Sequence, residues 1–170
     1  MSALTVKGIE IPPRITVAER QLELNGVGIK SKFFVEAYVA CLYLLDKSED
    51  AEEIISADRP QAIILHITSS RVTNERLVSG TLEAMVKASD DGLAPIQAQV
   101  DRFLGLLEQE VSKGDMFELA YVPGSGTSVS MNGKRLGVVE GMPFKKALFG
   151  IWLSDRPTQK SLKKQLLSAL

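Results

Sequence analysis

The chain has 170 residues, of which 45% are hydrophobic, and this size and composition fit one compact domain over residues 1–170. Its 20 lysine and arginine residues nearly balance 21 aspartate and glutamate residues, so no overall positive field favours nucleic acid as a partner. Cys41 and His66 are the single cysteine and the single histidine, which excludes an internal disulfide and the usual four-ligand zinc sites. We therefore expect no metal and no cofactor.

The amino-terminal segment MSALTVKGIEIPPRI has no charged stretch followed by an apolar one, so it does not read as a signal peptide. No run approaches the roughly 18 apolar residues that a membrane-spanning helix needs. We expect no stable membrane insertion and a cytoplasmic location, or a periplasmic one if a leader was removed.

The first quarter of the chain predicts short antiparallel strands. Apolar residues alternate there in three pairs, Ile9 and Ile11, Ile15 and Val17, Leu22 and Leu24. The dipeptide Asn25-Gly26 predicts a tight turn after the third pair. Residues 32–45 are apolar at odd and even positions alike, which predicts a bent central strand that is covered on both faces.

Helices and strands then follow in blocks. A short helix is predicted after Ser48, a strand over residues 61–69, and two amphipathic helices over residues 73–88 and 96–109. A three-stranded meander follows, with turns at PGSG and Asn132-Gly133, and the tail is helical again. Blocks of this kind, without regular βαβ alternation, predict an α+β fold whose antiparallel sheet is backed by helices on one side.

Most motifs with a known chemistry are absent. The string Gly124-Ser125-Gly126 lacks a following GK[ST] and lies between two strands, so it predicts a hairpin turn and no phosphate loop. The string GVGIKS fails the dinucleotide pattern, and its glycines predict a turn or a bulge. His66 lies mid-strand without an assigned nucleophile, and Cys41 reads as a small apolar residue. We assign no catalytic residue.

Lys30 and Tyr38 lie within the long apolar stretch LNGVGIKSKFFVEAYVACLYLL. A cation and a phenol on an apolar wall could bind a carboxylate headgroup while the wall holds a chain. Alternatively, Lys30 is solvated at a strand end and Tyr38 is a core aromatic whose hydroxyl finds a backbone partner. Trp152 is likewise either a core residue or the cap of a ligand cavity.

Three segments together resemble the bacterial chalcone isomerase-like family. They are NGVGIKSKFFVEAYVACLYL, YVPGSGTSVSMNGK and FKKALFGIWLSDRPTQKSLKKQLL, and the resemblance extends from about Gly8 to the end of the chain. It implies an open-faced β-sandwich, in which a large antiparallel sheet packs against a layer of helices with a cleft between them. In the plant isomerases of this superfamily the cleft closes a chalcone into a flavanone without a cofactor, by stabilising an oxyanion.

The residues of that isomerase machinery are mostly unmatched. The resemblance places Tyr38 where the isomerases have a strand threonine and Ile151 where they have a late threonine, and their helix tyrosine and asparagine fall near Asn74 and Thr81. No tyrosine lies between Tyr43 and Tyr121. Ring-closing isomerase activity is therefore not expected.

A fatty-acid-binding branch of the superfamily holds a carboxylate with an arginine and a tyrosine. Tyr38 matches that tyrosine, and Lys30 stands at the position of the arginine, which keeps the charge but loses the bidentate fork. The resemblance thus predicts a non-catalytic protein that binds an apolar acidic ligand such as a fatty acid at Lys30 and Tyr38. The alternatives are an intramolecular lyase or isomerase with an unknown enone-type substrate, and an interaction module with a self-filled cleft.

Overall fold

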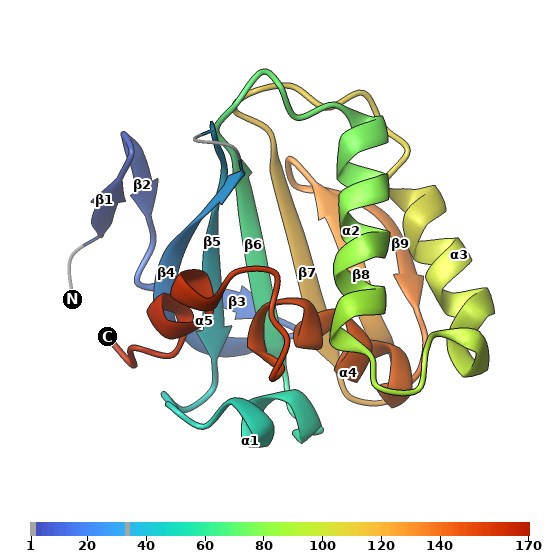
Figure 1. The fold of residues 1–170 in the computed structure, drawn as a ribbon. Helices are drawn as coiled ribbons and strands as arrows, with labels where there is room; N and C mark the ends of the chain where they lie inside the picture. Colours follow the sequence, from blue (N-terminus) through green and yellow to red (C-terminus); the bar gives the residue numbers. More distant parts are fainter. Residues whose placement is uncertain (1–2, 33–34) are drawn as a thin grey trace.

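The computed structural model describes residues 3–32 and 35–170, which form an α+β fold. Seven strands make one antiparallel sheet in which each strand pairs with its neighbours along the chain, and β1 and β2 make a separate hairpin (Figure 1). The strands are β1 (Leu4–Val6), β2 (Ile9–Ile11), β3 (Arg14–Val17), β4 (Arg20–Lys32), β5 (Val35–Leu44), β6 (Gln61–Ile67), β7 (Met116–Val122), β8 (Gly126–Met131) and β9 (Lys134–Val139).

The helices cover one face of the large sheet (Figure 1). They are α1 (Ala51–Ser56), α2 (Asn74–Ala88), α3 (Gln97–Leu106), α4 (Met142–Leu153) and α5 (Lys160–Leu166), with a 3-10 turn η1 (Ala94–Ile96) before α3. The side chains of Asp50 and Thr73 accept hydrogen bonds from backbone N–H groups and cap α1 and α2. None of the described helices is long and apolar enough to cross a bilayer.

Side chains of β5 alternate between two cores, as the period of two requires. Ala40, Leu42 and Leu44 face the helices, whereas Val39 and Cys41 face the other side of the sheet. The β1–β2 hairpin contributes Ile11 to this second core. The predicted central strand with two buried faces is therefore confirmed, as is the α+β sheet backed by helices.

The predicted turn at Asn25-Gly26 is wrong. Strand β4 continues through both residues, and its pairing with β5 shifts register between Leu24 and Gly26, which marks a bulge. The Asn25 side chain is fully buried and donates to Ser48 O and to Leu166 O, each over 2.9 Å. A Cβ on Gly26 would lie 2.4 Å from the backbone oxygen of Leu166, so glycine lets the carboxyl-terminal segment approach the strand.

The predicted start of the central strand at Lys32 is also wrong. Lys32 is the last residue of β4 and pairs with Val35, the first residue of β5, so the chain reverses between them. The two phenylalanines that the prediction placed in this strand, Phe33 and Phe34, lie outside the described residues. The sequence did not indicate this reversal, because no glycine, proline, asparagine or aspartate stands between Lys32 and Val35.

Side chains of the carboxyl-terminal segment cover the outer edge of β4 beyond its pairing with β3, which ends at Glu23. Gln165 Oε1 accepts from the N–H of Ile29 over 3.1 Å, and Gln159 Oε1 accepts from the N–H of Ser31 over 2.9 Å. Gln159 Nε2 donates to the carbonyl of Ile29 over 3.0 Å. The two glutamines therefore satisfy backbone groups that lack a neighbouring strand.

One lysine of α4 is fully buried beneath α1. Lys145 Nζ donates to the carbonyl oxygens of Ile54, Ile55 and Ala57 over 2.7, 2.7 and 2.8 Å, which uses all three of its donors. The ammonium also lies 5.5 Å from the ring centre of Tyr121 and 5.1 Å from that of Phe149. Lys145 thereby binds the carboxyl-terminal end of α1 to the body of the protein.

Candidate functional site

A cavity of about 700 Å³ lies between the sheet and helix α2. Its floor comes from β5, β6 and β7, and α3 and α4 complete its walls. The apolar and aromatic side chains that line it are Val35, Ala37, Tyr38, Leu65, Val72, Leu77, Ala84, Phe103, Leu107, Phe117, Leu119, Ile151 and Trp152. Such a volume and lining are typical of small-molecule sites.

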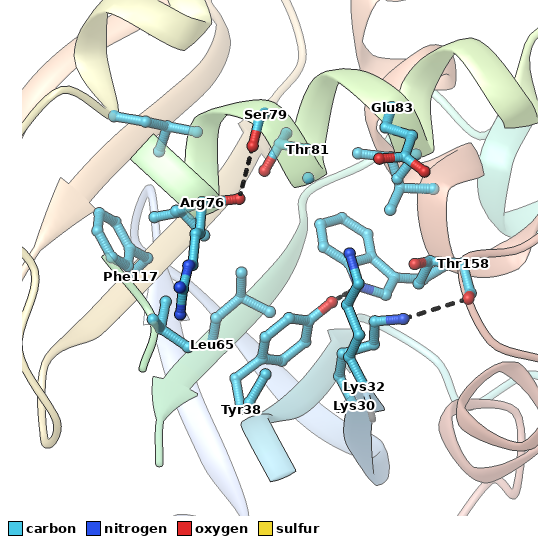
Figure 2. Close-up of a pocket in the computed structure, with 18 of the residues that line it drawn as sticks. Lys30, Lys32, Tyr38, Leu65, Arg76, Ser79, Thr81, Glu83, Phe117 and Thr158 are labelled. Carbon is cyan, nitrogen blue, oxygen red and sulfur yellow. Dashed lines mark hydrogen bonds between the residues drawn. The ribbon is translucent and has the colours of Figure 1, made fainter. Parts of the chain in front are cut away.

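Lys30 and Tyr38 are direct cross-strand partners in the β4–β5 hairpin, and both line the cavity. Because side chains alternate along a strand, Tyr38 lies on the same face as Ala40, which belongs to the helix-facing core. The structure thus brings together the two residues that the sequence singled out (Figure 2). Their role in binding a ligand stays a prediction.

The Tyr38 hydroxyl has a defined partner. Trp152 Nε1 donates to it over 2.9 Å, and an indole nitrogen can only donate, so the Tyr38 oxygen is the acceptor. Burial raises the pKa of Tyr38 to about 12, and the Trp152 hydrogen bond opposes this only in part. At neutral pH the residue is therefore a neutral phenol whose own proton remains available to an acceptor in the cavity.

Lys30 is half-buried at one end of the cavity. Its ammonium donates to the carbonyl of Thr158 over 3.3 Å, and this is its one hydrogen bond among the described residues (Figure 2). Burial lowers the pKa of Lys30, and the nearby ammoniums of Lys32 and Lys87 lower it further, while Glu83 raises it. The charged form of an ammonium that is desolvated and close to like charges is stabilised when an anion binds beside it.

The segment between α4 and α5 closes the cavity at this end. Lys87, at the last turn of α2, donates to the carbonyl of Pro157 over 3.0 Å, next to the Thr158 carbonyl that Lys30 contacts. Arg156 donates from Nε to the Lys87 carbonyl over 2.8 Å and also pairs with Asp90. Two cavity lysines and one arginine therefore hold this segment in place.

The cavity lining carries more positive than negative charge. Among the described residues that line it, Glu83 is the one acidic side chain, and five are basic, Lys30, Lys32, Arg71, Arg76 and Lys87. Of these five basic residues, the sequence indicated only Lys30 as a site residue. The other four occupy positions where the sequence pattern predicts solvated surface. Arg76 and Lys87 could have been found only by noticing that they share a face of α2 with Leu77 and Ala84.

Three of the four positions that the isomerase resemblance identified line the cavity. They are Tyr38, Thr81 and Ile151, whereas Asn74 is not part of the described lining. Trp152 is almost fully buried and also lines the cavity, so both readings of this residue hold in part. An isoleucine at position 151 cannot donate a hydrogen bond to an oxyanion.

The other residues with possible chemistry lie away from the cavity. Cys41 is fully buried in the second core, and burial raises the pKa of its thiol to about 12, so it stays protonated and unreactive. His66 pairs with Val39 and points to the same side as that second core, and burial lowers its pKa. Among the described residues, no group of three or more histidine, cysteine, aspartate or glutamate side chains could hold a metal ion.

Fold and site together define an open-faced α+β sandwich with an apolar cavity and a cationic rim. The chain belongs to the chalcone isomerase-like family, because the model of that family matches residues 3–168. This confirms the prediction of a chalcone isomerase-like protein, and the bacterial origin of the resembling family stays a prediction.

A solved structure has the same fold. The crystal structure of the fatty-acid binding protein AtFAP1 from Arabidopsis thaliana matches with a TM-score of 0.80 at 16% sequence identity. The match covers 98% of this chain and 96% of that one. At this identity the likeness establishes the fold and leaves the function to be argued from the site. A search of curated proteins found no match to the chain.

Proposed function

We propose that this protein binds an amphiphile with an apolar chain and an acidic headgroup, such as a fatty acid, and does not convert it. The observation that carries the proposal is the cavity of about 700 Å³ between the sheet and α2, with an apolar interior and basic side chains around it. The size lies within the range of small-molecule sites. The interior would receive the chain, because burying apolar surface drives such binding.

Lys30 and Tyr38 are the proposed headgroup residues. The Tyr38 oxygen already accepts from Trp152, which leaves its proton to donate to a carboxylate. The Lys30 ammonium has three donors, of which Thr158 takes one. Lys30 and Tyr38 lie on adjacent strands, so the ammonium and the phenol can each donate one charge-assisted hydrogen bond to a carboxylate. The name of the similar Arabidopsis protein, a fatty-acid binding protein, supports the same ligand class.

The two alternatives have less support. An intramolecular lyase or isomerase acting on an enone-type substrate needs donors at the developing oxyanion, and Ile151 supplies none at the position that matches the isomerase threonine. An interaction module with a self-filled cleft is at odds with the volume of the cavity. Measurable consumption of a chalcone above background, abolished by Tyr38→Phe, would revive the first alternative.

The experiment combines native mass spectrometry of the purified protein with calorimetric titration of palmitate and oleate. We expect binding of one fatty acid per chain, about tenfold weaker in Tyr38→Phe, since a hydrogen bond to a charged group contributes roughly 1.5 kcal/mol or more. Tyr43→Phe is the matched control, because the Tyr43 hydroxyl donates to Pro12 O over 2.8 Å from the other core. Absence of both a copurified lipid and fatty-acid binding would refute the proposal.

A further inference from the structure

Helix α2 presents a cation to the cavity near each of its ends. Arg76 lies in the first turn and Lys87 in the last, and both line the cavity together with Leu77 and Ala84 between them. Arg76 and Lys87 are eleven positions apart in the sequence. At a rise of 1.5 Å per residue, their backbone positions lie about 16 Å apart along the helix axis. The cavity therefore has two positively charged ends with an apolar stretch between them.

The lysine end is the headgroup site already described. The pKa of Lys30 is lowered by burial and then by Lys32 and Lys87, so these three ammoniums lie close together. Glu83 raises the same pKa, which places the one acidic residue of the described lining near this end as well. A single carboxylate bound at Lys30 and Tyr38 would leave the other end of the cavity without a counter-charge.

The arginine end consists of Arg71 and Arg76. Arg76 Nη1 donates to the carbonyl of Arg71 over 2.9 Å, which holds this side chain folded back against the loop before α2. Figure 2 shows Arg76 reaching from α2 toward Leu65 and Phe117 of the floor, while Lys30 and Lys32 lie beyond Tyr38. A guanidinium has five donors, so the bond to Arg71 leaves Arg76 with four.

The charges of Arg71 and Arg76, like those of Arg20, Arg102 and Arg135, are not balanced by an ion pair among the described residues. Arg71 and Arg76 are distinguished from these three because both line the cavity. An arginine fork in such a cavity suits a planar, bidentate anion. The remaining arginines, Arg14, Arg59 and Arg156, each form an ion pair with a carboxylate.

We propose that the ligand of this cavity carries a second anionic group, bound by Arg71 and Arg76, and is therefore an apolar chain with a carboxylate at each end. This proposal rests on the proposed function, because it takes the same cavity and the same Lys30–Tyr38 headgroup site. The apolar stretch between the two ends receives the chain, and the separation of about 16 Å between the Arg76 and Lys87 positions along α2 favours a long one. The arginine end then selects a dicarboxylate over a simple fatty acid.

The test compares hexadecanedioate with palmitate, two ligands of equal chain length that differ in the second carboxylate. We expect hexadecanedioate to bind the wild-type protein about tenfold more tightly, as one charge-assisted bidentate pair at a partly exposed site allows. In Arg71→Gln/Arg76→Gln this advantage should disappear, so that hexadecanedioate and palmitate bind the double variant with equal affinity. Arg20→Gln is the matched control, an exposed arginine of β4 outside the cavity lining.

The outcomes separate the two proposals. Equal affinities of the two ligands for the wild-type protein, or an advantage of hexadecanedioate that survives in the double variant, would overturn the second anionic site and leave fatty-acid binding intact. Binding of neither ligand would overturn both proposals. Circular dichroism of the double variant establishes that it is folded, and its palmitate affinity provides the internal reference.

Discussion

Lys30 and Lys145 are both at least partly shielded from water, but they differ in how many of their hydrogen-bond donors the protein itself occupies. Lys145 is fully buried and gives all three donors to the carbonyls of Ile54, Ile55 and Ala57. Lys30 is half-buried and gives one donor to Thr158 O, beside a cavity of about 700 Å³. Burial of a cation therefore does not by itself mark a ligand site. What distinguishes the two is whether donors remain for a partner that is not part of the chain.

The largest effect is expected for Lys145→Met. The substitution removes the partner of three carbonyl oxygens at the end of α1, and we expect the free energy of unfolding to fall by about 3 kcal/mol. Urea denaturation measures this, with Lys146→Met as the control because Lys146 is exposed on the same helix. Equal stability of the two variants would contradict a structural role for Lys145.

The pH dependence of stability should also identify Lys145. Burial lowers the pKa of Lys145 to about 8 from an ordinary value of 10.5, so between these values the unfolded chain binds more protons than the folded one. Relative to Lys145→Met, the free energy of unfolding of the wild-type protein should therefore rise with pH from about pH 8 to pH 10, by up to about 2 kcal/mol. Denaturation curves of both proteins at unit steps of pH measure this difference.

Lys30→Gln tests the other side of the comparison. We expect the affinity for palmitate to fall about tenfold, because the substitution removes a charge-assisted hydrogen bond to the carboxylate. The free energy of unfolding should change by less than about 1 kcal/mol, since Thr158 O loses a single partly exposed partner. A loss of stability as large as that of Lys145→Met would mean that Lys30 serves the fold.

The smallest effect is expected for Lys30→Arg. A guanidinium offers a carboxylate two parallel hydrogen bonds in place of one, so palmitate should bind about fivefold more tightly than to the wild-type protein. Calorimetric titration compares the two proteins, and Lys146→Arg provides a control with the same substitution, because Lys146 is exposed on α4 and is not part of the described cavity lining. Weaker binding in Lys30→Arg would show that the site fits an ammonium.

The sequence predicted what depends on local pattern. Apolar residues at odd and even positions of residues 32–45 predicted a strand with two buried faces, which the structure gives as Val35–Leu44. Helical spacing predicted a helix over residues 73–88, which is α2 (Asn74–Ala88). The turn expected at Asn25-Gly26 failed because Asn25 bonds to Leu166 O, 141 residues away, and no local signal carries that contact.

Prediction of the site was incomplete for the same reason. The apolar stretch around Lys30 and Tyr38 first indicated these two residues, and the family resemblance added weight to them. The structure then showed that they are cross-strand partners. In the sequence nothing distinguishes Arg71, Arg76 and Lys87 from ordinary surface residues. They line the cavity because α2, which carries Arg76 and Lys87, and the loop before it, which carries Arg71, lie beside it. The hydrogen bond from Trp152 to Tyr38 joins residues 114 positions apart.

The glutamines along the edge of β4 have a consequence for how the molecule meets copies of itself. An open strand edge is a template onto which a strand of another molecule can add. Gln159 and Gln165 occupy the N–H and the carbonyl of Ile29 and the N–H of Ser31, so another strand cannot pair with these groups unless the glutamines leave. Gln159 directly follows Thr158, the carbonyl partner of Lys30. Gln159, which covers the edge of β4, and Thr158, which holds Lys30 of the proposed ligand site, are thus adjacent, so we expect sequence changes at these two positions to affect both.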